Sequence, residues 1–156
     1  MTISDAVLWI ELLLVGCIIG GGVYQRTSLI PEWGGALPGS VVRYFRGTNA
    51  AAAISRFWKT VLPPASIGMF AAVALNWRFV DRRPWVGLAG AFYFANIAAT
   101  VVYFFPHGVT PLMLRSGEGM SDDEITRMAK SWILWDWIRL AGVVAIFFFL
   151  LGAIKA

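Results

Sequence analysis

Four long runs of apolar residues constrain the fold of this chain more than any other feature. They cover residues 6–24, 60–77, 84–105 and 132–154, each close to the ~20 residues with which an α-helix crosses the hydrocarbon core of a bilayer. Only 14% of the 156 residues are charged, against about 25% in soluble domains. We therefore predict a multi-pass protein of the cell membrane, with residues 1–156 forming one all-α domain, a four-helix transmembrane bundle.

Capping and breaking residues predict where the first helices begin and end. Ser4 is a plausible N-cap for a first helix that ends near Tyr24. The following connection, Gln25 to Thr48, contains two prolines and a glycine pair, so we expect a long irregular loop. Thr48 or Asn49 then caps the second helix, in which Pro63-Pro64 is expected to produce a kink.

The third and fourth helices have equally clear signals. The third is expected over Arg83 to Phe105, with Pro106 closing it. Ser121 and Glu124 have the spacing of a capping box, so the fourth helix begins at Ser121, outside the membrane. It continues to about Ile154 and must project from the bilayer.

The charged residues and the low numbers of histidine and cysteine limit which partners and cofactors we expect the protein to bind. The net charge of +4 comes from arginines and lysines beside apolar segments, where they meet lipid headgroups, so we expect a bilayer and no nucleic acid as partner. One histidine and one cysteine offer no metal-ligand spacing, and we expect neither a metal nor another cofactor. Gly16 and Gly20 form a small-residue face through which two copies of the chain could pack as a homo-oligomer.

The strongest functional signal is an ionisable pair inside the last apolar run. Asp136 and Arg139 are three residues apart and share one helical face, to which Trp132 belongs and beside which Trp135 lies. Such charges face a protein interior or a wet cavity when they lie in a membrane. The alternative is a structural ion pair that fixes the register of the helices.

The third predicted helix contributes a stripe of polar residues. The spacing of three, four, three and four residues places the following side chains on one face: Tyr93, Asn96, Thr100, Tyr103 and His107. They either bond neighbouring helices or form one wall of a pocket, with the Asp136 face as the other wall. Because these helices are antiparallel, His107 could meet Asp136 and Arg139 near the mouth.

Glu11, on the first helix, is a separate candidate. Its carboxylate either extends to the membrane surface or takes part in proton coupling.

The order of these features resembles the anthrone-oxygenase-like family of small four-helix integral membrane proteins. The resemblance rests on the run Trp132-Ile133-Leu134-Trp135-Asp136-Trp137-Ile138-Arg139, on Gly16, Gly20 and Tyr24 before Pro31, and on Pro106. The chain departs from the family pattern at His107-Gly108, where an asparagine is expected, and at Asp136, where relatives often have histidine. The resemblance implies oxidation of polycyclic aromatic anthrones without a metal or flavin.

We therefore expect a flat apolar small molecule between the third and fourth helices. In an enzyme, Asp136 or His107 would remove a proton from a C–H acid or phenol, and Arg139 would stabilise the oxyanion. The other residues named above, Tyr93, Asn96, Thr100, Tyr103, Trp132 and Trp135, would bind the substrate. The alternatives are a small proton-coupled exporter that uses Glu11 and a structural accessory membrane subunit.

Overall fold

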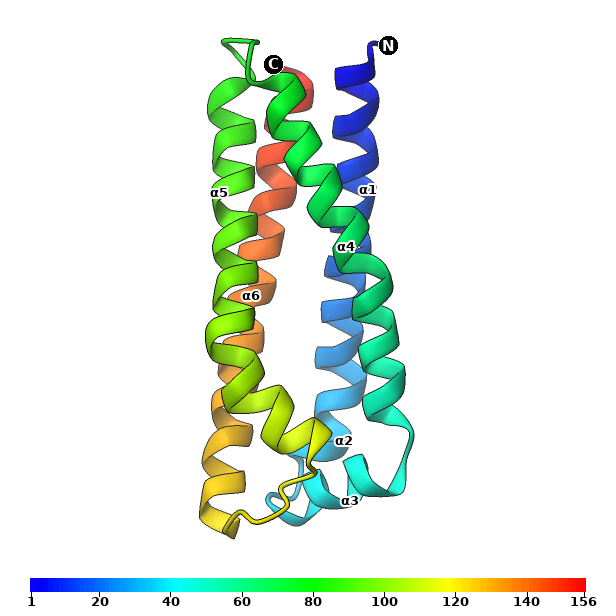
Figure 1. Ribbon diagram of the computed structural model, residues 1–156, viewed down its shortest axis with the longest axis vertical. Coiled ribbons are helices and arrows are strands. Elements are labelled where there is room, and N and C mark those ends of the chain that lie inside the picture. Colours follow the sequence, from blue (N-terminus) through cyan, green and yellow to red (C-terminus); the bar gives the residue numbers. More distant parts are fainter.

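The computed structural model describes residues 1–156 and is entirely helical (Figure 1). The elements are α1 (Ile3–Tyr24), the π-helical segment η1 (Gln25–Leu29), α2 (Ile30–Gly34), α3 (Gly39–Gly47), α4 (Ala50–Asn76), α5 (Arg83–Ala99), the π-helical segment η2 (Thr100–Leu114) and α6 (Asp122–Lys155). Four continuous helical stretches, 3–34, 50–76, 83–114 and 122–155, are long and apolar enough to cross a membrane. This confirms the prediction of an all-helical chain with four helices of membrane-spanning length.

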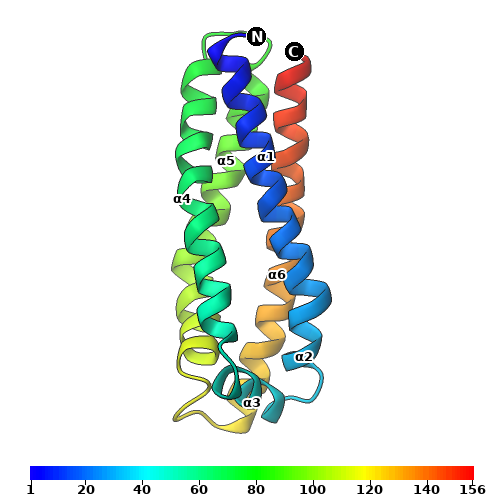
Figure 2. The same cartoon turned by 90° about the vertical axis from the view of Figure 1, so that its right-hand side faces the viewer.

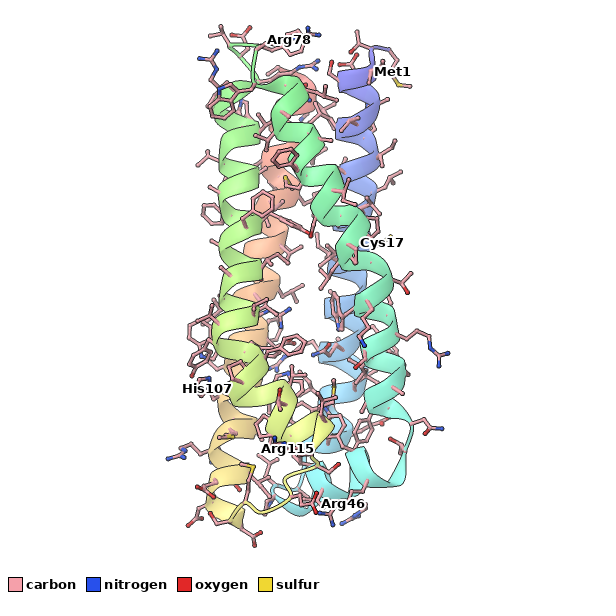
Figure 3. The ribbon with its side chains drawn as sticks, in the orientation of Figure 1. Met1, Cys17, Arg46, Arg78, His107 and Arg115 are labelled. Atoms are coloured by element: carbon pink, nitrogen blue, oxygen red, sulfur yellow. The ribbon has the colours of Figure 1, made fainter.

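The four long stretches lie side by side along the length of the molecule (Figures 1 and 2). α1 and α5 each contact both α4 and α6, so α4 and α6 are diagonally opposed. Both termini lie at the same end as the α4–α5 turn, whereas α2, α3 and the segment before α6 lie at the other end. We call these the terminal end and the loop end. In Figure 3, Met1 and Arg78 mark the terminal end, and Arg46 and Arg115 the loop end.

Capping boxes begin both α1 and α6. The box of α6 is the one that the sequence predicts: Ser121 Oγ accepts from the Glu124 backbone N–H, and Glu124 accepts from the Ser121 backbone N–H. In α1 the cap is Thr2, two residues before the expected Ser4, because the Asp5 carboxylate returns to the Thr2 N–H at 2.8 Å. Both helices therefore begin with their first N–H groups satisfied.

The connection after α1 differs from the irregular loop that we expected. The helix continues through η1 and α2 to Gly34, and after a short turn α3 follows. Pro31 does not break it: Pro31 lies in the first turn of α2, directly after the π-helical segment η1. The π-helical turn of η1 shifts the hydrogen-bonding pattern just before this point.

The third long helix also extends further than predicted. It passes Pro106 and Pro111 as η2 and ends at Leu114. The i→i+5 pattern persists to its end, where the Arg115 N–H donates to the Thr110 carbonyl at 3.0 Å. α4 is likewise continuous across Pro63-Pro64, and Figure 1 shows it changing direction about half-way along its length. This change of direction agrees with the predicted kink.

The interior has two separate apolar cores. The terminal core consists of residues from all four long helices: Leu8, Leu12, Val15, Ile18, Ala65, Met69, Ala72, Val86, Ala89, Tyr93, Ile146, Leu150 and Ala153. The aromatic core at the loop end consists of Ile30, Trp33, Val41, Phe45, Phe104, Val109, Leu112, Met113, Ile125, Ala129 and Trp132. A Cβ atom added at Gly16 or Gly20 would meet no atom of another helix within 4 Å, so homo-oligomer packing through this face stays a prediction.

Candidate functional site

A cavity of about 290 Å³ lies between α4 and α6, at the border between the two cores. On α4 it adjoins residues from Ile54 to Pro63. We call it the α4–α6 cavity. Its lining comes from η1, α4, η2 and α6: Gln25, Ile54, Ser55, Trp58, Lys59, Leu62, Pro63, Thr100, Phe104, Phe105, Val109, Met113, Trp132 and Arg139. The lining is thus mainly apolar and aromatic, with a few polar groups, which is the composition typical of small-molecule sites.

Two buried N–H groups of cavity-lining residues have no hydrogen-bond partner in the protein. They are Nε1 of Trp132 and Nε of Arg139. The Arg139 guanidinium carbon lies 4.5 Å from the centroid of the Phe104 ring, in a cation–π contact that fixes the side chain against the cavity wall. Buried donors are normally satisfied, so these two N–H groups are exceptions within the lining of the cavity.

Asp136 is buried beside the cavity, but its partner is not the expected one. Gln25 Nε2 donates to Asp136 Oδ1 at 3.3 Å, and Asp136 Oδ2 has no partner. No ion pair joins Asp136 to Arg139; the one ion pair of the protein is Arg82 to Asp5, at the terminal end. Since Gln25 also lines the cavity, it separates the carboxylate from the cavity interior.

The predicted polar stripe does not form one wall. Tyr93 faces α4, where its hydroxyl hydrogen-bonds Ser66 Oγ at 3.0 Å, and Asn96 faces α6, donating to the Arg139 carbonyl at 3.1 Å. Of the five residues, Thr100 alone lines the α4–α6 cavity. Tyr93 and Asn96 already contact different neighbours within regular α5. From Thr100 onward the helix is π-helical, and its wider turn no longer returns residues three and four apart to the same face.

Tyr103 and Trp135 contribute to a different depression. Their rings lie 5.1 Å apart, and together with Asn96 they line a groove of about 440 Å³ between α5 and α6, which we call the lateral groove. Phe104 and Arg139 line both the lateral groove and the α4–α6 cavity. Trp132, by contrast, lines only the cavity. Five of the six predicted substrate-binding residues are thus divided between the two, and Tyr93 lines neither.

His107 is exposed, on the outer side of η2 (Figure 3). Its ring stacks on Tyr103 at 4.9 Å between centroids, and its Nδ1 lies 2.9 Å from the Tyr103 carbonyl oxygen. No hydrogen bond or ion pair connects His107 with Asp136 or Arg139. The structure therefore brings Asp136, Arg139, Trp132 and Thr100 to one region and leaves His107 outside it.

Sequence reasoning missed the contribution of η1 and α4. Trp58, Lys59 and Pro63 of α4 line one side of the cavity, and Gln25 of η1 lines its inner end. A signal for α4 was present, because a proline pair inside an apolar helix produces a bend, and a bend creates space between neighbours. Gln25 had no such signal, because it lies in the segment that we expected to be an irregular loop.

Glu11 lies outside this site, within the terminal core. Its side chain is fully buried, and neither carboxyl oxygen has a hydrogen-bond partner. It packs against α4 at Gly68, where a Cβ atom would overlap the carboxyl oxygen Oε2. Glu11 therefore does not extend to a membrane surface, which was one of the two alternatives.

No family model, curated protein or solved structure matches this chain. The side chains of His, Cys, Asp and Glu form no group of three or more with the proximity of metal ligands. The interpretation of the site therefore rests on its own geometry.

Proposed function

We propose that the protein binds a flat, apolar small molecule with a carbonyl or phenolate oxygen in the α4–α6 cavity. The observation that supports this most directly is the pair of buried, unpartnered N–H groups on Trp132 and Arg139. Both belong to the lining of an otherwise mainly apolar cavity. A ligand oxygen that accepts from Arg139 would form a charge-assisted hydrogen bond, and Trp132 offers a second donor in the same lining.

The size and composition of the cavity favour a small aromatic ligand. Its volume of about 290 Å³ is at the lower end of the ~300–1,000 Å³ that is usual for ligand sites. The rings of Trp58, Phe104 and Trp132 provide flat apolar surfaces, against which aromatic rings pack favourably. The cavity lies at the loop-end limit of the apolar runs, because its lining on α4 begins at Ile54, before residue 60, and its lining on η2 extends to Met113, past residue 105.

The reaction that we propose for this site is the oxidation of an anthrone-like substrate, in line with the family resemblance of the sequence. The methylene carbon loses two hydrogen atoms and gains one oxygen atom from O₂, and the second oxygen atom leaves with the two hydrogens as water. Arg139 would stabilise the oxyanion that forms when the methylene group loses its first proton. Asp136 would accept this proton through Oδ2 once Gln25 moves aside.

The test compares binding of anthrone with binding of anthracene, which has the same three fused rings but no oxygen. Isothermal titration of the detergent-solubilised protein under nitrogen measures both ligands in wild type and in Arg139→Leu. Because a hydrogen bond from a charged donor contributes about 1.5–3 kcal/mol, we expect the variant to bind anthrone roughly ten- to a hundredfold more weakly. Binding of anthracene should change little.

Arg56→Leu is the matched control, because Arg56 is an exposed arginine of α4 that does not line the cavity. It should bind both ligands as wild type does. Equal weakening of anthrone and anthracene in Arg139→Leu would show that the substitution perturbs the cavity in general. No preference of the wild type for anthrone over anthracene would contradict the proposal.

A further inference from the structure

Glu11 is the one carboxyl group that the protein encloses completely without any partner. Its side chain has no solvent-exposed surface, and both oxygens lack hydrogen-bond partners. Its neighbours along the same face of α1, Leu8 and Val15, are also fully buried. Glu11 lines neither the α4–α6 cavity nor the lateral groove.

The facing helix is shaped to receive this carboxyl group. Gly68 of α4 lies directly against Oε2, and any larger residue there would overlap it. The residues around Gly68 on α4, Ala65, Met69 and Ala72, are fully buried and apolar. The carboxyl group thus has a close-fitting place in the α1–α4 interface that offers it no hydrogen-bond donor.

No charge from the other helices compensates Glu11. The nearest titratable group of α5 in the terminal core is Tyr93, whose hydroxyl bonds Ser66 Oγ and approaches the Leu62 carbonyl at 3.5 Å. The basic residue that forms an ion pair, Arg82, pairs with Asp5 at the terminal end. None of the residues of α6 in the terminal core is charged.

We propose that Glu11 is a proton-binding site, held as a neutral carboxylic acid in the interface between α1 and α4. An isolated carboxylate in an apolar interior is so costly that such a group takes up a proton instead. A proton is also the one ligand small enough for this place, because the carboxyl group already fills the space left by Gly68. The site is independent of ligand binding in the α4–α6 cavity.

A consequence concerns how the proton leaves. With the interface closed, neither oxygen has a hydrogen-bond partner, so we expect deprotonation to require that α1 and α4 separate at Gly68. Binding of a proton to Glu11 and contact between α1 and α4 therefore favour each other: the bound proton stabilises the closed interface. This is the property that a proton-coupled membrane protein requires of its exchanging carboxyl group.

Infrared spectroscopy of protein labelled with ¹³C in its glutamate side chains tests the proposal. The chain has four glutamates, and the other three, Glu32, Glu118 and Glu124, are exposed. Exposed glutamates show the bands of carboxylates at pH 7. We expect the isotope-shifted spectrum of the full chain in lipid vesicles to contain one additional carbonyl band, that of a carboxylic acid free of hydrogen bonds.

Two variants assign the band. Glu11→Gln, a neutral substitution of nearly the same shape, should remove it, whereas Glu118→Gln should leave it unchanged and remove carboxylate intensity instead. The wild-type spectrum alone suffices if Glu11→Gln does not fold, because exposed glutamates have no acid band at this pH. A wild-type spectrum with carboxylate bands only would overturn the proposal, as would an acid band that persists in Glu11→Gln.

Discussion

The terminal half and the loop-end half of this molecule are built from the same four long helices but packed in different ways. In the terminal half, regular α-helices approach closely through small residues, and Ala72, Ala89 and Ala153 are fully buried. In the loop-end half, the two π-helical segments and the bend of α4 separate the helices, and large aromatic rings fill part of the space. The remaining space includes the α4–α6 cavity and a second cavity of about 300 Å³ between η1 and α4.

The difference shows where a helical bundle can accommodate a ligand. Gln25 lies in η1, and Thr100 and Phe104 lie in η2, so residues of both π-helical segments line the cavity. Such segments change the direction in which side chains point and are frequent at functional sites. In the regular half the same close packing encloses Glu11, and a cavity of about 240 Å³ lies at the terminal end, beside Asp5 and Arg82.

Of the substitutions that test this difference between the two halves, Trp33→Ala in the aromatic core should lower the free energy of unfolding most. Trp33 is 1% exposed, and its ring contacts those of Phe45 and Trp132. Truncating a buried tryptophan typically costs ~3–5 kcal/mol, and we expect a loss of this order in the free energy of unfolding in mixed micelles. Trp9→Ala is the control, because Trp9 is 47% exposed. Equal losses would show that the aromatic core does not hold the loop end together.

Gly68→Ala, in the terminal half, should lower the free energy of unfolding by an intermediate amount. The added methyl group would overlap the Glu11 carboxyl group, and overpacking of this kind costs about 1–3 kcal/mol. The double variant Glu11→Ala/Gly68→Ala should recover most of the loss due to Gly68→Ala, measured relative to Glu11→Ala alone. Gly16→Ala, with open space at its Cβ position, should be nearly neutral. If Glu11→Ala does not relieve the loss of stability caused by Gly68→Ala, the close contact between Gly68 and the Glu11 carboxyl group is refuted.

Of the three substitutions, Tyr93→Phe should lower the free energy of unfolding least. The substitution removes the hydroxyl that bonds Ser66 Oγ across α4 and α5, and a hydrogen bond of this type contributes ~1 kcal/mol. Thermal unfolding should therefore show a modest decrease relative to wild type. Tyr24→Phe, at a tyrosine that is 60% exposed, should show none. A decrease for Tyr24→Phe as large as that for Tyr93→Phe would argue against a role of this bond in the regular half.

The regular elements could be predicted from the sequence because their signals are local. Apolar length identifies the four long helices, and the spacing of Ser121 and Glu124 identifies the start of α6. The continuation of two helices past Pro31 and Pro106 could not be predicted, because a proline in a sequence usually ends a helix. Whether it does depends on the π-helical pattern around it, which the residues themselves do not reveal.

The candidate site was partly predictable for the same reason. The spacing predicts Trp132, Asp136 and Arg139 on one face of α6. Trp132 and Arg139 line the cavity, and Asp136 is hydrogen-bonded to Gln25, which also lines it. The partner of Asp136 is Gln25, 111 residues away in the sequence, and no periodicity along a single helix indicates such a contact. The expected encounter with His107 fails because the spacing rule of an α-helix does not apply within η2.

The central claim is that the ligand occupies the α4–α6 cavity and not the lateral groove. The most direct measurement is titration of anthrone into Ser55→Phe and Ala99→Phe. Ser55 lines the cavity and Ala99 lines the lateral groove, so each added ring occupies one of the two spaces. We predict that Ser55→Phe loses anthrone binding while Ala99→Phe binds as wild type does. Retained binding in Ser55→Phe together with loss in Ala99→Phe would contradict the account.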